Sequence, residues 1–269
     1  MKKILLILIT ILSYSGIYAQ NDSIYFWKQN TLIHKQSIKT VDLDSITFKR
    51  PVVNPNGINI AGPNVTDIDG NTYQSVTNCG LTFTKQNLNV TTYSDGTPIP
   101  QVTDQNAFVG STTGAWCYYN NDPANGAVYG KLYNWYAAAG IYDAASLANP
   151  TLRKKLAPTG WHIPSDAEWT TLTTCLGGEP VAGGKMKETG TAHWTTPNTG
   201  ATNDSGFTAL PGAYRDNVGA FYLIGLQGYW WSSSEGNGAW SRRLIWGSAS
   251  VYRNNSSKGC GFSVRCLRD

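Results

Sequence analysis

The last eleven residues, GCGFSVRCLRD (259–269), decide how the chain folds. Apolar side chains occupy every second position of this stretch, namely Phe262, Val264 and Cys266. Such alternation is typical of a β-strand with one face on a core, so the residues between them, Ser263 and Arg265, are predicted to face outward. A free cysteine packs as a small apolar group. The register of Cys266 therefore favours a buried closing strand over a reactive thiol site shared with Cys260.

The other cysteines leave the disulfide pattern open. The chain has five in all: Cys79, Cys117, Cys175, Cys260 and Cys266. An odd number leaves at least one thiol unpaired, and no two cysteines have the C-x-x-C spacing. The sequence is compatible with one or two disulfides, and equally with mostly buried free thiols.

The N-terminal residues 1–19 have the pattern of a secretory signal peptide. Lys2 and Lys3 precede an apolar run at 4–12, and Gly16-Ile-Tyr-Ala19 supplies a small residue at the predicted cleavage site before Gln20. The run is too short to span a bilayer, and no other segment approaches 18 apolar residues. With no cysteine near the cut, a lipid anchor there is not expected. We predict an exported protein, secreted or at the cell surface, without a transmembrane segment.

Composition excludes some classes of partner. The formal net charge is +4, and it falls to +2 when Lys2 and Lys3 leave with the signal peptide. No run of lysine or arginine is dense enough for a nucleic-acid surface, so no nucleic-acid partner is predicted. Charged residues make up only 14% of the chain, against 28 glycines, ten tryptophans and fifteen tyrosines. Many short turns and few long helices fit this composition.

The remaining chain divides into a small and a large part. Two short strands at 24–27 and 45–48 predict a β module over 20–50. A linker rich in proline and glycine follows at 51–64. The main domain is then predicted over 65–269.

Local signals within the main domain predict short elements. Asp69-Gly70 predicts a hairpin turn, and strands are expected at 81–84 and 87–90. Ser165 and Glu168 have the spacing of a capping box, which predicts a helix over 165–176. Further helices are expected at 131–139 and 185–188. Alternation over 239–246 predicts a strand that places Trp240, Arg242, Leu244 and Trp246 on one face.

Six motifs resemble a known family in both order and spacing. They are Asp67-Ile-Asp-Gly-Asn-Thr-Tyr73, Gly130-Lys-Leu-Tyr-Asn-Trp-Tyr136, the segment from Pro158 to Trp169, the segment from Asn203 to Gly212, Tyr229-Trp-Trp-Ser-Ser-Ser-Glu235 and the closing segment from Gly261 to Asp269. Over 65–269 the chain resembles the Fibrobacter succinogenes major paralogous domain, common in exported proteins of Bacteroidetes and related bacteria. That family is related to formylglycine-generating enzymes and their C-type-lectin-like fold. The resemblance implies an α+β domain with a small twisted antiparallel sheet, two main helices, long irregular loops and a central final strand.

The residues offer little support for catalysis. Formylglycine-generating enzymes bind copper through a close cysteine pair, for which Cys260 and Cys266 are the only candidates, and the local motif differs. An iron site would need several histidines, but His34, His162 and His193 are scattered. No Gly-x-Ser-x-Gly elbow is present, and no pair of facing carboxylates is indicated. We predict a protein that is not an enzyme, with an oxidase of the formylglycine-generating type as the alternative.

No cofactor is predicted, although a structural Ca²⁺ stays open. The sugar-binding tripeptides of C-type lectins do not occur in the chain. Asp122, Asn203 and Asp204 carry oxygen ligands of the kind that calcium prefers, and all three also fit ordinary roles in turns.

The stretch 229–258 predicts the ligand-binding surface. Tyr, Trp, Ser, Gly, Asn and Arg supply 23 of its 30 residues, a composition typical of binding surfaces. Its tryptophans also fit a core role. The polar and aromatic residues expected in turns or on the outward face are the candidate ligand-binding residues: Asn237, Arg243, Tyr252, Arg253, Asn254 and Asn255. We therefore predict a non-catalytic binding or adhesion protein for an extracellular glycan or protein, with a structural cell-envelope domain as a further alternative. The sequence indicates neither a particular ligand nor an oligomeric state.

Overall fold

The computed structural model describes residues 17–20, 23–28, 31–37 and 59–269, and it divides the chain into two units, 1–52 and 53–269. In the first unit, β1 (Ile17–Gln20), β2 (Ser23–Lys28) and β3 (Thr31–Ser37) form an antiparallel sheet in that order. The strand predicted at 24–27 lies within β2. The strand predicted at 45–48, the apolar run of the signal peptide and linker residues 51–58 lie outside the described residues.

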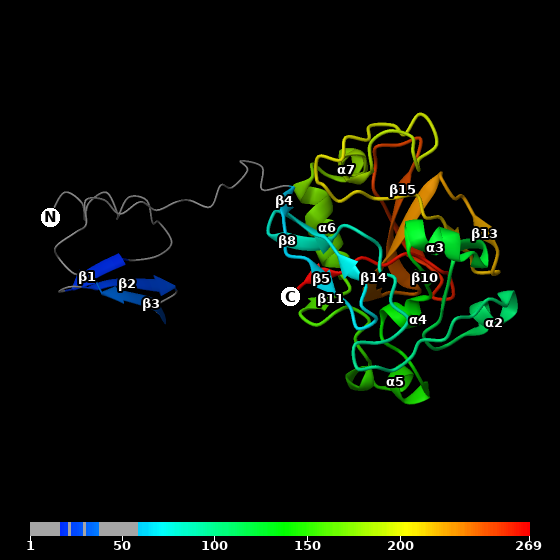
Figure 1. The fold of residues 1–269 in the computed structure, drawn as a ribbon, viewed down its shortest axis with the longest axis horizontal. Coiled ribbons are helices and arrows are strands. Elements are labelled where there is room, and N and C mark those ends of the chain that lie inside the picture. Colours follow the sequence, from blue (N-terminus) through cyan, green and yellow to red (C-terminus); the bar gives the residue numbers. More distant parts are fainter. Residues whose placement is uncertain (1–16, 21–22, 29–30, 38–58) are drawn as a thin grey trace. The chain divides into compact units, whose positions relative to one another are not determined.

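The second unit is built around a five-stranded antiparallel sheet in which the end of the chain is an interior strand. Its order is β11-β17-β8-β7-β4. The strands are β4 (Ile60–Ala61), β7 (Ser75–Asn78), β8 (Leu81–Thr84), β11 (Trp161–His162) and β17 (Leu267–Arg268). In Figure 1 the red closing segment runs through the middle of this unit. The expected central position of the final strand is confirmed.

From Gly259 to Leu267 the closing segment is buried, which corrects one prediction. Phe262, Val264 and Cys266 are buried as expected, but Ser263 and Arg265 are only 2% and 1% exposed. The prediction from the alternation assumed that one face of the strand is exposed to solvent. In the structure the segment bridges Tyr133 at Phe262 and Trp230 at Ser263, and the Cys266 carbonyl accepts from Thr84. Because chain packs on both sides of it, its polar side chains must find acceptors inside the protein.

A second antiparallel sheet is a simple meander. β14 (Gln227–Glu235) pairs with β15 (Ala239–Ile245), and β15 pairs with β16 (Tyr252–Ser256). The prediction for this region is confirmed in register: Arg242 and Leu244 are buried, while Trp240 and Trp246 are half-buried. A bulge between Trp231 and Glu235 interrupts the pairing of β14 with β15.

Three two-stranded sheets complete the β structure. They are β5 (Val65–Thr66) with β6 (Thr72–Tyr73), β9 (Trp116–Cys117) with β10 (Leu132–Tyr133), and β12 (Tyr214–Arg215) with β13 (Phe221–Tyr222). The hairpin predicted at Asp69-Gly70 joins β5 to β6. The strand predicted at 87–90 does not form, because the main chain of Leu88 bonds irregularly to Val264 and Lys131 instead.

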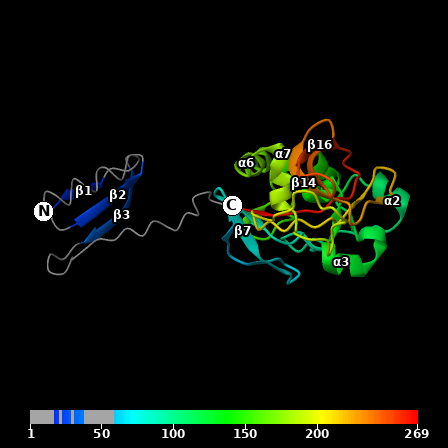
Figure 2. The same cartoon turned by 90° about the horizontal axis from the view of Figure 1, so that it is seen from above.

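Helices are short. They are α2 (Gln105–Gly110), α3 (Pro123–Tyr129), α4 (Trp135–Ala138), α5 (Ala144–Ala148), α6 (Asp166–Cys175) and α7 (Glu179–Met186), with 3₁₀ turns at Tyr119–Asn121 and Pro150–Leu152. Of these, α2, α3 and α6 lie toward the outside of the unit in Figure 2. The capping box of α6 is confirmed. The helix predicted at 131–139 is confined to α4, because the Asn134 side chain caps it there. Pro180 begins α7 earlier than predicted. The unit is therefore a mixed α+β fold.

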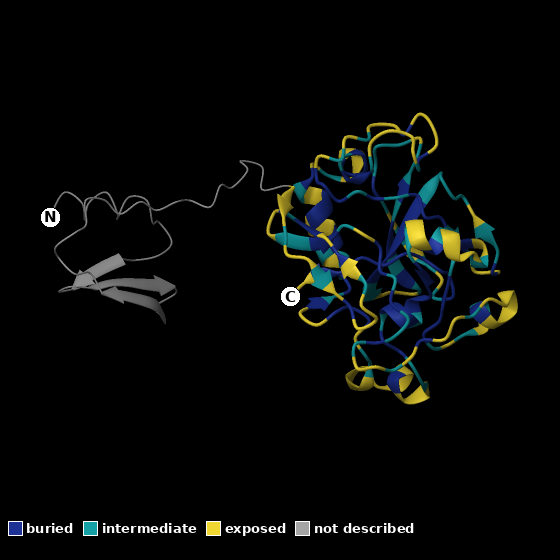
Figure 3. Cartoon of the chain, in the orientation of Figure 1, coloured by how far each residue is buried: buried dark blue, intermediate teal, exposed yellow. Residues whose placement is uncertain are grey.

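Five tryptophans lie fully inside the core. Those fully buried are Trp135, Trp169, Trp194, Trp230 and Trp231, and Figure 3 shows the dark buried segments of the interior enclosed by exposed loops. Each of their indole N–H groups donates to an acceptor, in four cases a main-chain carbonyl and for Trp230 the Asn87 side chain. Burial of the large rings is therefore achieved without leaving a polar atom unpaired.

One disulfide joins two distant parts of the unit. Cys79, in the turn between β7 and β8, is bonded to Cys175 at the end of α6. Cys117, Cys260 and Cys266 are free and buried. The sequence left open either one or two disulfides or mostly buried free thiols, and the structure has one disulfide together with three buried thiols.

A buried lysine holds three loops together. Lys187, which follows α7, is fully buried, and its ammonium donates to the main-chain oxygens of Thr199, Ile245 and Ser248 at 2.9, 3.1 and 2.9 Å. Burial lowers the pKa of Lys187 to about 8. The ammonium satisfies the Thr199 and Ser248 carbonyls and adds a second hydrogen bond to the Ile245 carbonyl, which also accepts from the Ser248 N–H.

We predict that Lys187→Met, which keeps the apolar stem but removes the donor, destabilises the protein strongly. Each buried acceptor left unpaired costs about 1–3 kcal/mol, so the free energy of unfolding in urea should fall by about 3 kcal/mol or more. The control is Lys185→Met, at a half-buried position of α7, which should change that free energy by about 0.5 kcal/mol at most. Equal losses in the two variants would contradict the role given to the ammonium.

Candidate ligand-binding surface

The structure divides the predicted binding residues between the two faces of the β14–β15–β16 sheet. Side chains of directly opposed residues in an antiparallel pair lie on the same face. Arg243 opposes Tyr252 and Ser241 opposes Asn254, whereas Arg242 opposes Arg253 and Trp240 opposes Asn255. Arg243, Tyr252 and Asn254 therefore share one face, and Arg253 and Asn255 share the other. Asn237 is exposed in the turn between β14 and β15.

The first face carries a cluster of tyrosines around an arginine. The guanidinium of Arg243 lies 4.8 Å from the ring centre of Tyr252 and 5.9 Å from that of Tyr229. The Tyr229 ring is 4.6 Å from Tyr214, which is 6.0 Å from the exposed Tyr222. We call Tyr214, Tyr222, Tyr229, Arg243 and Tyr252 the tyrosine–arginine surface.

The core supports this surface from below. The Tyr229 ring stacks on Phe262 at 4.8 Å, and Phe262 in turn lies 4.2 Å from Trp231. Burial raises the pKa of Tyr229, and also that of the more exposed Tyr214. The Tyr229 hydroxyl donates to the Gln227 side-chain oxygen at 2.7 Å. Rings held by packing lose little entropy when a ligand binds.

On the opposite face, two arginines share one carboxylate. Asp166, the first residue of α6, accepts from Arg242 Nη1 at 2.7 Å and from Arg253 Nη2 at 2.8 Å. The Arg253 guanidinium also lies 3.4 Å above the ring centre of Trp240. Although burial raises it, these arginine hydrogen bonds lower the pKa of Asp166 overall. Arg253 therefore serves the packing of α6 on the sheet. Asn255 is similarly engaged, because its side-chain oxygen accepts from the Gly238 N–H.

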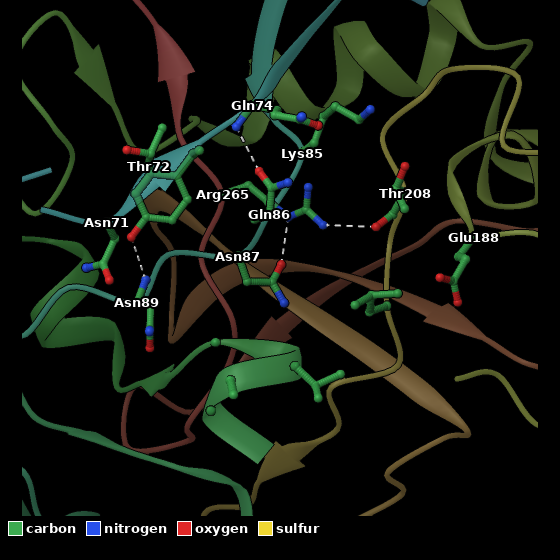
Figure 4. Close-up of a pocket in the computed structure, with 16 residues that line it drawn as sticks. Asn71, Thr72, Gln74, Lys85, Gln86, Asn87, Asn89, Glu188, Thr208 and Arg265 are labelled. Atoms are coloured by element: carbon green, nitrogen blue, oxygen red, sulfur yellow. Dashed lines mark hydrogen bonds between the residues drawn. The ribbon is translucent and has the colours of Figure 1, made fainter. Parts of the chain in front are cut away.

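A polar cleft lies elsewhere, and the sequence did not indicate it (Figure 4). Its volume is about 470 Å³, within the range of small-molecule sites. Arg265 lies in its wall. The other residues that line it come from five further segments: Asn71, Thr72, Tyr73, Gln74, Lys85, Gln86, Asn87, Asn89, Gly126, Ala127, Val128, Gly130, Glu188, Thr208 and Leu210. Each segment supplies four residues or fewer, so no single motif defines the cleft.

Histidines and acidic residues do not gather into a metal site within the described part of the chain. His162 lies between Glu168 and Asp269, at 3.0 and 2.6 Å, and His193 lies 2.8 Å from Glu188. The side chain of His34 lies outside the described residues. Among the calcium candidates, Asp122 caps α3, Asn203 holds a turn with Thr208, and Asp204 is exposed.

The free cysteines are held as thiols. Burial raises the pKa of Cys117 to about 11 and that of Cys260 to about 12, and it raises the pKa of Cys266 further. Thiolates bind metals and attack substrates, whereas thiols in apolar surroundings are inert. The three side chains act as packing groups in this environment, as expected for Cys266.

The family model for the Fibrobacter succinogenes major domain matches residues 76–268. The chain belongs to this family. No curated protein and no solved structure matches it. The matched part of this Fibrobacter succinogenes major domain includes the whole tyrosine–arginine surface and most of the cleft. No helix among the described residues has the length and hydropathy needed to cross a membrane.

We predict that Asp166→Asn destabilises the protein by about 3 kcal/mol, because it leaves the buried Arg242 without its counter-charge. Arg253→Gln removes the more exposed partner, whose side chain is 39% accessible, and should cost about 1 kcal/mol at most. Both are measured by urea unfolding. The folded-state pKa of Asp166 lies below its ordinary value of 3.8, so its contribution is complete above that pH and is lost as the pH falls further. The stabilities of wild type and Asp166→Asn should therefore converge in acid, and a constant gap would contradict this.

We also predict that none of the free thiols reacts with a disulfide reagent in the native protein at mildly alkaline pH. Unfolding without reductant should expose three reactive thiols, as only Cys79 and Cys175 are paired. Unfolding with reductant should expose all five. Rapid native labelling of Cys260 or Cys266 would show that these side chains are accessible, and would revive the alternative of a thiol-based enzyme.

Proposed function

We propose that this protein is an exported, non-catalytic binding or adhesion protein whose tyrosine–arginine surface contacts a glycan or protein outside the cell. The observation that carries the proposal is the state of Arg243. Its charge has no carboxylate partner among the residues that the structure describes, and its Nε is buried without an acceptor. An arginine flanked by tyrosines in this way is a typical anchor of a binding surface.

The contrast with the neighbouring arginines strengthens this interpretation. Arg242 precedes Arg243 in β15, and Arg253 follows Tyr252 in β16. Both donate to Asp166. Arg243 is left with aromatic faces and an unused donor, although a buried unpaired polar group costs stability. A ligand oxygen at Arg243 would satisfy that donor, and the Tyr214, Tyr222 and Tyr252 rings would pack against apolar parts of the same ligand.

The proposed scaffold is the C-type-lectin-like fold. The interior position of β17, the short antiparallel strands and the long loops between them are consistent with it. Export is supported by the N-terminal sequence pattern and by the Cys79–Cys175 disulfide, since disulfides persist mainly in oxidising compartments. Because the candidate cysteines are buried thiols, we favour binding over oxidase chemistry. The uncompensated Arg243 favours it over a purely structural envelope domain.

We predict that Arg243→Gln and Tyr252→Ser each weaken binding by about tenfold or more, as expected for residues at the centre of an interface. Glycan and surface-protein arrays with the purified chain would identify the ligand, and calorimetry would measure the variants. The matched control is Arg253→Gln, on the neighbouring face of β16, which should leave affinity unchanged. A chelator added to one array reports whether calcium takes part. Binding that is indifferent to Arg243 and Tyr252, or abolished by Arg253→Gln, would exclude this surface.

A further inference from the structure

Arg265 is a buried cation without a counter-ion in the wall of the polar cleft. Its Nε donates to Asn87 at 2.6 Å, and Nη1 donates to the carbonyls of Thr84 and Phe207 at 2.7 and 3.1 Å. Nη2 donates to the Thr208 carbonyl at 3.2 Å. All four acceptors are neutral, and no carboxylate pairs with Arg265 among the described residues. A guanidinium has five N–H groups, so one donor on Nη2 is unused.

The other unused groups of the cleft are mainly donors. In the part of the chain that the structure describes, four side-chain donors have no protein acceptor: Nε2 of Gln86, Nδ2 of Asn89, Nζ of Lys85 and the side-chain Nε2 of Gln74. Two of the amide oxygens are engaged: that of Gln86 accepts from the Gln74 N–H at 2.9 Å, and that of Asn89 accepts from Lys131 at 2.8 Å. Asn71 is the opposite case, because its Nδ2 donates to Asp67 and its oxygen is available as an acceptor. Figure 4 shows Gln86 and Asn87 beside the Arg265 guanidinium. A cleft with an excess of donors suits a ligand rich in oxygen acceptors.

The charges that line the cleft limit the ligand further. Lys85 and Arg265 are cationic and Glu188 is anionic, which gives the lining a net charge of +1. Glu188 lies across the Thr208 segment from Arg265 in Figure 4. One net positive charge favours a monoanion, and a carboxylate at the rim opposes a ligand with several negative charges.

We propose that this cleft binds a carboxylated sugar, a hexuronate unit, with its carboxylate toward Arg265 and Lys85 and its hydroxyls on the side-chain amides. The carboxylate supplies the negative charge that the buried guanidinium lacks, and hydroxyls can both accept from and donate to amides. The rigid part of the wall is already fixed: Asn87 accepts from Arg265 and Trp230 and donates to the Tyr129 carbonyl. The site is therefore formed before the ligand arrives. It is separate from the tyrosine–arginine surface and does not depend on the function proposed for it.

Calorimetry of the purified chain with D-galacturonate and D-glucuronate tests the chemistry. The methyl ester of galacturonate and D-galactose are matched neutral ligands, and inorganic phosphate is a matched anion without a sugar ring. We expect at least one uronate to bind about tenfold or more tightly than any of these three, since a hydrogen bond to an ionised group is much stronger than one to a neutral group. Equal affinity for uronate and galactose, or displacement of uronate by equimolar phosphate, would overturn the proposal.

Two further measurements fix the location without disturbing Arg265. Lys85→Gln should weaken uronate binding about threefold or more, while Lys155→Gln, at an exposed position outside the cleft, should leave it unchanged. Nuclear magnetic resonance of the wild-type chain should show uronate shifting the Nε–H signal of Arg265 and the side-chain amide signals of Gln74 and Gln86. Shifts centred on Arg243 and Tyr252 instead would move the uronate to the tyrosine–arginine surface and overturn the cleft assignment. If the arrays find no ligand for the tyrosine–arginine surface, the measurement of uronate binding in the cleft still stands.

Discussion

The guanidinium of Arg265 connects the parts of the main unit that are most distant in sequence. It donates to Thr84 at the end of β8, to Asn87 in the following loop, and to Phe207 and Thr208 more than a hundred residues later. Burial lowers the pKa of Arg265 to about 9, which shows how unfavourable its surroundings are for a charge. Such a group is tolerated only if its acceptors are correctly placed. The position of the closing segment is therefore specified by polar geometry as well as by Phe262 and Val264.

Two lysines likewise donate to neutral main-chain carbonyls. Lys187 is surrounded by three main-chain carbonyls, and Lys131 donates to the Asn89 carbonyl and side chain while lying 4.7 Å from the Trp116 ring centre. Irregular loops leave carbonyls without strand or helix partners, and an ammonium can satisfy several of them at once. Buried cations thus compensate for the scarcity of regular structure. Arg265, Lys187 and Lys131 are therefore structural cations.

Features that depend on residues close together in the sequence could be predicted. Features that depend on contacts between distant parts of the chain could not. The capping box of α6 and the Asp69-Gly70 turn depend on neighbours, and both formed as predicted. Alternation correctly buried Phe262, Val264 and Cys266, but it misplaced Arg265 because it contains no information about chain packed on the other side. The Cys79–Cys175 bridge spans 96 residues, and the six segments of the cleft share no local signal. The sequence could name candidate residues in the predicted binding stretch, but which strand face each residue occupies was decided by register.

Because of that register, two neighbouring arginines of β15 lie in different electrostatic surroundings. Arg242 turns toward α6 and finds Asp166, while Arg243, its neighbour, turns toward Tyr229 and Tyr252 and finds no carboxylate among the described residues. The first arginine stabilises the fold because its partner is part of the protein. For the second, the flanking rings supply a favourable but weaker environment, and an oxygen ligand would improve it. Asp166 thus pairs with both Arg242 and Arg253, whereas Arg243 and Arg265 have no carboxylate partner among the described residues. In the two proposals above, an acceptor from outside the chain takes that place.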